Sequence, residues 1–432
     1  MSSGAGRRLE TSAAGRHGRR PAERLSAATW RLAVAASLAF YLDAATVITV
    51  AIALPLWRDH YRLDAWQVGL LSSGLAFGIA IGAVVGGRLG DRFGRGVVFT
   101  VDLMVFAAAT IMIAFAPDAW TLLAGVVVVG LAAGADMPTA LTVLSDAAPV
   151  GTHGRLVGLT QVSWIAAILI TYALGFATSG LGFLGAQLLS LHLVVVALLT
   201  VLLRLTLAGP TRPVTRQPAA PPPRLRAAGA LPALLATGGF LLLWNVASST
   251  LGSYGTYVLV TVTGLTQTQA TGLVLVGFPP ALLMSVIFTR LADSPWRDRL
   301  FVVAMLLQIA AYTAGAATGG VVAGGMLVLV VLYSLSNVFA GEAIYKVWSQ
   351  LLLPPAVRAT AVGLSYGVAR GVAAAFLLLV PLALESHAGE LLWLLAGCVT
   401  ASGLIGLVII NHRAWRPLLH PQRRTFTDTL SE

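Results

Sequence analysis

Residues 86–95 read Gly86-Gly87-Arg88-Leu89-Gly90-Asp91-Arg92-Phe93-Gly94-Arg95, a short charged loop between two long apolar segments. Because a charged loop this short cannot lie in hydrocarbon, the flanking segments are predicted to span a membrane and the loop to mark one of its faces. A partial repeat, Thr289-Arg290-Leu291-Ala292-Asp293-Ser294-Pro295-Trp296-Arg297, matches Arg88, Leu89, Asp91 and Arg95 at one constant offset. The repeat predicts a duplicated membrane protein with two halves.

The composition excludes an ordinary soluble protein. The 432 residues are 57% hydrophobic and 10% charged, whereas soluble domains carry about 25% charged residues. The net charge of +11 comes from basic tails and loops without interleaved aromatic residues, so membrane topology explains it better than nucleic-acid binding. The single cysteine, Cys398, excludes an intrachain disulfide and a cysteine-based metal cluster.

The apolar runs predict twelve spans, since a helix needs about 20 apolar residues to cross a membrane. We expect an all-α membrane protein whose twelve transmembrane helices form two pseudo-symmetric six-helix halves. Residues 1–29 are predicted to be a disordered N-terminal tail, and residues 207–230 a Pro- and Arg-rich linker. The halves are residues 30–206 and 231–411, with a tail at 412–432. The predicted spans are 30–56, 66–88, 97–116, 120–144, 157–178, 183–205, 231–259, 269–291, 300–318, 321–348, 360–384 and 389–411.

The basic residues predict the orientation. Of the 28 Lys and Arg residues, all but Arg58, Arg62 and Arg370 fall in the tails and loops that share the side of the N terminus, or in the span ends next to them. By the positive-inside rule, both termini and the linker are cytoplasmic, in a multi-pass protein of a plasma membrane. The arginine, alanine and glycine richness indicates a bacterial source.

The duplication extends beyond the charged loops. Asp146-Ala-Ala-Pro149 is followed nine residues after the proline by Gly158-Leu159, and Leu351-Leu-Leu-Pro354 is followed at the same distance by Gly363-Leu364. Two six-span halves around a central cavity, with a site near the midplane, are typical of secondary transporters.

Together, the spans, the linker and the motif Gly87-x-Leu89-Gly90-Asp91-Arg92-x-Gly94-Arg95 resemble the major facilitator superfamily over essentially the whole chain. The segments 341–350 (Gly-Glu-Ala-Ile-Tyr-Lys-Val-Trp-Ser-Gln) and 134–139 (Gly-Ala-Asp-Met-Pro-Thr), with Leu42-Asp43, are similar to the sugar-porter group, nearest its bacterial inositol and polyol transporters. Leu351 departs from the acidic residue common at that place, and the Pro-Glu-Ser-Pro-Arg segment of many sugar porters is absent. For the loop residues, the resemblance implies a cytoplasmic latch in which Asp91 meets a helix N-terminus of the other half near Arg358. The gating and charge-network residues are Arg88, Asp91, Arg92, Arg95, Arg290, Asp293, Glu342, Lys346 and Arg358.

Two acidic residues are candidates for proton coupling. Asp43 lies near the middle of the first span, where a charge disfavours insertion by about 2.5–3.5 kcal/mol. Because desolvation favours its protonated form, it is predicted to capture and release a proton; the alternative is a structural hydrogen bond between helices. Asp136, beside Pro138, is a second coupling acid, a substrate hydroxyl acceptor, or the partner of a cytoplasmic-side arginine.

Three further charges lie in or near the last spans. Glu342 and Lys346 are spaced to pair along one helix face, and their place near the cytoplasmic end favours a structural or gating pair over substrate contact. Arg370 cannot lose its charge, so it must face the cavity or a carboxylate. It pairs with Asp43 or Asp136 across the halves, or binds an anionic substrate.

Polar and aromatic residues on other spans suit a ligand with hydroxyl groups, because amides and hydroxyls both donate and accept and indole faces stack on ring faces. For each of them, interhelical packing is the alternative. Tyr254 and Tyr257 are residues of the membrane interface or an outer lid. The predicted substrate-binding residues are Gln161, Trp164, Trp244, Asn245, Ser248, Asn337 and Arg370.

These features predict a proton-coupled importer of a sugar, polyol or inositol that acts as a monomer in the lipid bilayer. The rival is a transporter of organic or aromatic acids, or a drug exporter, on the same fold. No phosphate-binding loop occurs in the sequence, so we expect no ATP-driven pumping, and the histidines show no metal-ligand spacing. We expect a transporter and not an enzyme, with no metal and no cofactor and with the proton gradient as the driving force.

Overall fold

All regular secondary structure in the described residues is helical. The structure, a computed structural model, describes residues 27–93, 95–147, 153–207, 230–291, 294, 296–318, 323–354 and 357–419. Helices suit a membrane because they satisfy every backbone hydrogen bond within one segment. In chain order the elements are α1 (Ala27–Tyr61), α2 (Ala65–Phe93), α3 (Arg95–Ala114), α4 (Ala119–Ala147), α5 (His153–Thr178), the 3₁₀ turn η1 (Ser179–Leu181), α6 (Phe183–Leu207), α7 (Leu231–Thr261), α8 (Gln267–Gly277), α9 (Pro279–Leu291), α10 (Arg297–Ala317), α11 (Ala323–Ser336), α12 (Glu342–Leu352), α13 (Arg358–Ser386), α14 (Ala388–Asn411) and α15 (Arg416–Leu419).

The predicted membrane spans are present. In the described residues, ten helical segments are long and apolar enough to cross a membrane, and two shorter apolar helices, Val101–Ala114 and Gly324–Ser336, occupy the remaining predicted positions. Each of the twelve predicted spans therefore corresponds to one helix or to two consecutive helices, and the prediction of an all-α membrane protein is confirmed.

Two of the predicted spans are broken. The span expected at 269–291 divides into α8 and α9 at Phe278, because Pro279 and Pro280 provide no backbone N–H for a continuing helix. The span expected at 321–348 divides into α11 and α12, separated by residues 337–341. Apolar periodicity alone does not reveal such breaks.

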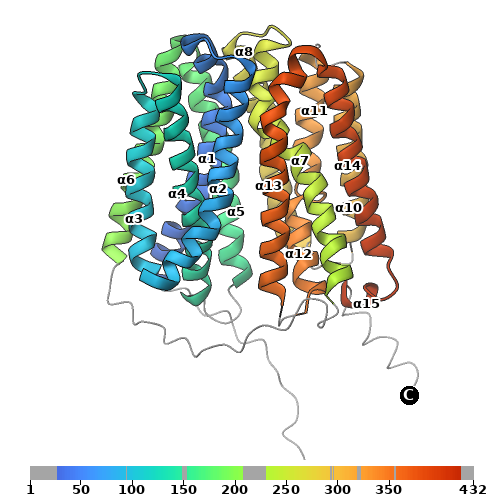
Figure 1. Ribbon diagram of the computed structural model, residues 1–432. Coiled ribbons are helices and arrows are strands. Elements are labelled where there is room, and N and C mark those ends of the chain that lie inside the picture. Colours follow the sequence, from blue (N-terminus) through green and yellow to red (C-terminus); the bar gives the residue numbers. More distant parts are fainter. Residues whose placement is uncertain are drawn as a thin grey trace, which may run out of the picture.

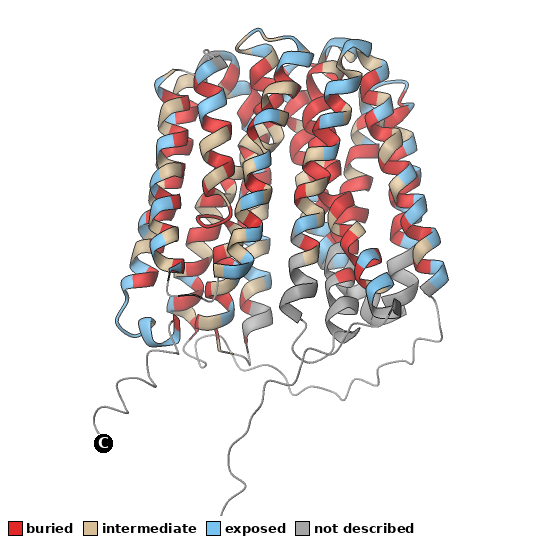
Figure 2. Ribbon diagram, turned by 180° about the vertical axis from the view of Figure 1, so that it is seen from behind, coloured by how far each residue is buried: buried red, intermediate tan, exposed pale blue. Residues whose placement is uncertain are grey.

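The helices stand in two groups side by side (Figure 1). Helices α1–α6 lie on the left of that view, and α7 and α10–α14 on the right. Buried residues face the interior of the bundle, while exposed residues line its outer sides (Figure 2). Large apolar side chains point outward, such as Val276 at 75% exposure and Leu235 at 66%. An apolar outer surface of this kind faces lipid.

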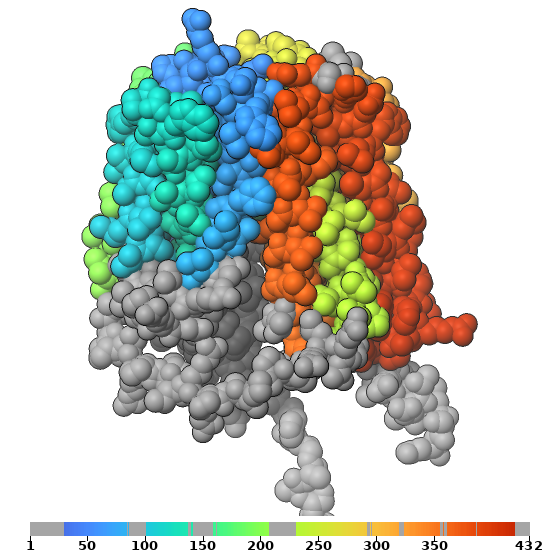
Figure 3. Space-filling view, in the orientation of Figure 1, coloured from blue at the N-terminus to red at the C-terminus, as the bar shows by residue number. Residues whose placement is uncertain are grey.

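The two groups make contact at the end of the bundle away from the C terminus. Helices α2 and α13 touch along the upper part of the front surface (Figure 3). At Gly69 of α2, a Cβ atom would collide with the carbonyl oxygen of Leu378, so only glycine allows this approach. Nearby, the Gln267 amide donates to the Ile52 carbonyl at 2.8 Å, and Arg58 lies 3.6 Å from Glu385.

Candidate functional site

A cavity of about 190 Å³ lies between the two groups of helices. Its walls come from α1, α2 and α5 on one side and from α7, α8, α11, α12 and α13 on the other. Most of its lining is apolar, with a small number of polar and charged side chains, as in most small-molecule sites. The predicted substrate or coupling residues that line it are Asp43, Trp164, Trp244, Asn245, Ser248, Asn337 and Arg370.

Asp43 is the acid on the wall formed by α1. It is 4% exposed, and its carboxylate is within hydrogen-bond reach of the Trp164 indole on α5. Its Oδ1 atom has no hydrogen-bond partner among the described groups. A buried carboxylate with one free oxygen at a cavity wall can take up a proton or accept a bond from a solute hydroxyl.

Arg370 of α13 provides the positive charge of the cavity. It is close enough to interact electrostatically with Asp43 from the opposite group of helices and with Glu342 of α12. Among the described side chains, no carboxylate lies within ion-pair distance of Arg370. The arginine therefore keeps its guanidinium donors directed at the cavity rather than held in a short ion pair.

Glu342 begins α12 and lines the cavity together with Asn337 and Arg370. The break between α11 and α12 brings it there. Its Oε1 atom lies 2.8 Å from Lys346 Nζ, so the predicted i, i+4 pair is present, and it accepts a hydrogen bond from the Tyr366 hydroxyl at 2.9 Å. Of this pair, Glu342 lines the cavity.

The break itself is shaped by close packing. At Gly341, a Cβ atom would come within 2.7 Å of the Trp244 ring, so the backbone lies directly against the indole. With the Gln308 amide turned to satisfy both groups, its oxygen accepts from Trp244 Nε1 and its nitrogen donates to the Ala340 carbonyl, each at 3.3 Å. Backbone without helical hydrogen bonds is tolerated at membrane depth where it is packed in protein or lines a cavity.

Hydroxyl and amide groups of α7 face the same space. Ser248 and Tyr333 of α11 share a hydrogen bond of 2.6 Å between their hydroxyl oxygens, and Ser249 donates to Asn245 Oδ1 at 3.3 Å. Asn337 Oδ1 is buried and has no partner among the described groups. Tyr333 was not among the predicted residues, because a tyrosine in an apolar run gives no signal in the sequence.

The comparisons with known proteins agree with this architecture. The model of the Major Facilitator Superfamily matches residues 32–378. The chain belongs to this superfamily. It is 29% identical over 418 residues to the minor myo-inositol transporter IolF of Bacillus subtilis (strain 168), covering 92% of this chain and 94% of IolF.

Two further comparisons support this assignment, one with the sequence of a relative and one with a solved structure. Over 151 residues, 35% of this chain and 32% of the relative, it is 29% identical to the arabinose-proton symporter of Bacillus subtilis (strain 168). The crystal structure of a D-xylose-proton symporter matches with a TM-score of 0.72 at 16% identity, covering 87% of this chain and 97% of that one. The predicted resemblance is confirmed, and the chain is a multi-pass membrane transporter of the major facilitator superfamily, not an enzyme.

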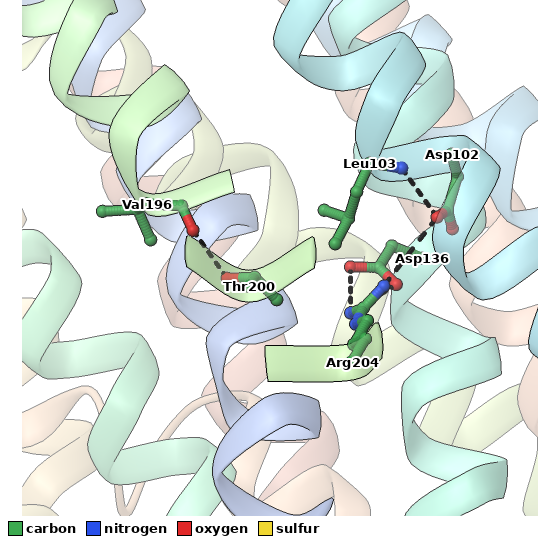
Figure 4. A network of polar contacts seen from close by, with 6 residues as sticks. All are labelled: Asp102, Leu103, Asp136, Val196, Thr200 and Arg204. Carbon is green, nitrogen blue, oxygen red and sulfur yellow. Dashed lines mark hydrogen bonds and ion pairs between the residues drawn. The ribbon is translucent and has the colours of Figure 1, made fainter. Parts of the chain in front are cut away.

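Asp136 does not line the cavity. It lies inside the first group of helices, where Arg204 Nη2 of α6 donates to its Oδ2 atom at 2.9 Å, with Asp102 of α3 beside both (Figure 4). The pairing of Asp136 with Arg370 is therefore wrong, and of the predicted alternatives the geometry favours an arginine partner. Asp102 and Arg204 were missed, since each stands near the end of an apolar run, where a charge is ordinary.

Tyr254 and Tyr257 are buried near the end of α7, at 1% and 2% exposure, which is unlike residues of a lipid interface. The Tyr254 hydroxyl donates to the Leu377 carbonyl at 2.8 Å, and the Arg58 guanidinium lies 5.6 Å from the centre of the Tyr257 ring. Neither ring lines the cavity, and both make contacts with the other helices near this end of α7.

Most of the remaining predicted residues lie in helices, near the end of α2, at the starts of α3 and α13, in α5 and at the end of α9. Arg290 is exposed at the end of α9. Asp293 lies outside the described residues. The same holds for the side chains of Arg88, Asp91, Arg92, Arg95, Gln161 and Arg358. The latch and the role of Gln161 stay predictions.

Proposed function

We propose that this transporter imports a sugar, polyol or inositol together with a proton, in a bacterial plasma membrane with both termini in the cytoplasm. The observation that carries the proposal is the cavity in which Asp43 of one helix group faces Arg370 of the other. The likeness to IolF over nearly the whole chain supports the substrate class. The arabinose-proton symporter among the relatives supports coupling to protons.

The hydroxyl and amide groups of the cavity would recognise the solute by hydrogen bonding to its hydroxyl groups. Asn245, Ser248 and Asn337 can each donate and accept, as a hydroxylated ring requires, and the Trp164 and Trp244 indoles offer faces for its apolar side. Direct hydrogen bonds of this kind contribute about 0.5–1.5 kcal/mol each. Several are therefore needed to hold a neutral solute.

Proton coupling would use the free oxygen of Asp43. When Asp43 is ionised, it and Arg370 balance each other's charge across the cavity; when it is protonated, Arg370 loses that balance. The two protonation states thus differ in how strongly the two helix groups attract each other at the cavity. A proton arriving from outside would favour one arrangement and its release inside the other, with no cofactor.

The experiment measures solute-dependent proton uptake in right-side-out vesicles. We expect external alkalinisation when an inositol, polyol or sugar is added to the wild type, and its loss in Asp43→Asn. With a pH difference of one unit, one coupled proton supports about tenfold accumulation, because one unit corresponds to about 1.4 kcal/mol. Asp43→Asn should abolish this accumulation and retain exchange of labelled for unlabelled solute.

Asp118→Asn is the matched control, since Asp118 is an exposed residue that caps the start of α4 through bonds from the Trp120 and Thr121 backbone N–H groups. It should transport like the wild type. Solute-driven proton uptake that survives Asp43→Asn would exclude Asp43 as the coupling acid.

A second candidate is a proton-coupled transporter of organic acids, which the Arg370 guanidinium in the cavity favours. The same vesicles distinguish the two candidates. Proton flux with a carboxylate-bearing solute and none with any polyol would establish this candidate and leave the fold unchanged.

A further inference from the structure

Three charged side chains meet inside the first group of helices, away from the cavity. Arg204 of α6 lies 2.9 Å from Asp136 of α4 and 3.8 Å from Asp102 of α3 (Figure 4). Exposure is 5% for Arg204, 3% for Asp136 and 7% for Asp102. We call these three residues the buried triad; neither the solute nor the coupling step proposed above uses it.

The charges of the triad do not balance if all three groups are ionised. Arginine stays protonated in proteins, so two carboxylates would face one guanidinium and leave one negative charge in a medium of low dielectric constant. Desolvation disfavours that charge by several kcal/mol. One proton on one carboxyl group removes it.

The contact between the two carboxyl groups points the same way. Asp102 and Asp136 lie within hydrogen-bond reach of each other. Ionised carboxylates only accept hydrogen bonds, so two of them can form such a bond only when one carries a proton. Asp102 Oδ2 is buried and has no donor among the described groups.

Asp102 is the better place for the proton. Arg204 Nη2 lies 2.9 Å from both oxygens of Asp136, which favours an ionised Asp136, whereas the shortest distance from Arg204 to Asp102 is 3.8 Å. The Leu103 backbone N–H donates to Asp102 Oδ1 at 2.8 Å, so Oδ2 is the oxygen free to bear hydrogen.

Other charged groups near the triad are few in the part of the chain that the structure describes. Asp43 on α1 acts on Asp136 electrostatically and adds negative charge. Arg31 at the start of α1 is exposed, and His192 of α6 lies about three turns along the helix from Arg204. The described side chains of α2 and α5 carry no charge. No described group therefore offsets the second carboxylate.

We propose that the buried triad is a second proton-binding site, separate from the solute cavity, in which Asp102 and Asp136 share one proton and Arg204 holds Asp136 as its counter-ion. The site binds its proton without any solute. The driving force of the proposed function passes through Asp43 and does not use this second site.

Infrared spectroscopy of the purified full-length protein in lipid nanodiscs tests the proposal with no solute present. A protonated carboxyl group gives a C=O stretching band that a carboxylate lacks. We expect such a band from the shared proton of the buried triad, called the triad band below, at neutral pH in the wild type. It should be lost in both Asp102→Asn and Asp136→Asn. Either substitution leaves one carboxylate for one guanidinium, so no proton is needed. Asp102→Glu keeps the second acid and should keep a band at a shifted frequency.

Asp43→Asn and Asp118→Asn are the controls, and both should retain the triad band. A band that is unchanged in both Asp102→Asn and Asp136→Asn would overturn the proposal, since the triad would then be fully ionised. Loss in only one of the two variants would also overturn it, because an isolated protonated acid behaves in that way. A protein that shows the triad band and transports no polyol would refute the proposed function and leave the triad standing.

Discussion

Arg204 and Arg370 are two arginines at membrane depth with opposite surroundings. Arg204 is 5% exposed and held 2.9 Å from Asp136, inside one group of helices. Arg370 is half-buried at the cavity between the groups, and among the described side chains no carboxylate lies within ion-pair distance of it. The same side chain is fixed in one place and free to change partner in the other.

The difference in burial indicates what each arginine contributes, stability for Arg204 and transport for Arg370. A guanidinium enclosed with its counter-ion cannot leave without exposing a buried carboxylate, so its loss should appear as loss of stability. A guanidinium that faces a cavity keeps contact with water or solute, so its loss should appear in transport. Burial decides the role more than residue type does.

The largest effect is expected from Arg204→Met. This change removes the counter-ion of Asp136 and leaves two carboxyl groups buried, which should destabilise the protein by about 3–5 kcal/mol. Thermal unfolding of the detergent-solubilised protein, followed by the loss of the monodisperse peak in size-exclusion chromatography, measures this.

The matched control replaces the whole triad with Arg204→Met, Asp102→Leu and Asp136→Leu together. Apolar replacement of a complete buried ion cluster is often neutral or stabilising, so most of the lost stability should return. If Arg204→Met alone has the same unfolding temperature as the wild type, Arg204 does not stabilise the fold as the counter-ion of Asp136.

Arg370→Gln should have the opposite signature. Solute uptake should fall about tenfold or more, which corresponds to about 1.4 kcal/mol, because the charge that faces Asp43 is gone. The free energy of unfolding should change by less than about 1 kcal/mol, as it does for substitutions outside fully buried networks. Uptake assays and the same chromatographic series, run on one preparation, measure both.

Arg370→Lys refines this result. Lysine keeps the charge and loses the planar fork of donors, so partial uptake would indicate a charge role and full loss would indicate directed hydrogen bonds. A large loss of stability in Arg370→Gln, equal to that of Arg204→Met, would remove the distinction between the two arginines.

Much of the fold could be predicted from the sequence. Apolar runs of the length of a membrane, interrupted by the charged segment 86–95 and its partial repeat, are sufficient for twelve spans because the bilayer admits few alternatives. The segment itself was predicted to be a loop, whereas α2 continues to Phe93 and α3 begins at Arg95. The breaks at Phe278 and at 337–341 were not predicted. A break depends on what packs against it, such as the Trp244 ring at Gly341, and periodicity does not report that contact.

The site was predictable where a residue is out of place in an apolar run. Asp43, Asn245 and Arg370 stand out for that reason, and all three line the cavity. Asp102 and Arg204 stand near the ends of their spans, where charges are common, so nothing in the sequence links them to Asp136. Only the packing of α3, α4 and α6 brings the three together.

The smallest effect is expected from Lys346→Met. Lys346 and Glu342 are 2.8 Å apart, about the same as Arg204 and Asp136, yet their side chains are 47% and 31% exposed, compared with 2% and 4% for that pair. An exposed i, i+4 pair contributes about 0.3–0.5 kcal/mol, because water screens it. Glu342 also keeps the Tyr366 hydroxyl, 2.9 Å away. The unfolding temperature of Lys346→Met, measured in the same series as Arg204→Met, should therefore be close to that of the wild type. A loss as large as that of Arg204→Met would show that distance rather than burial determines what an ion pair contributes to this protein.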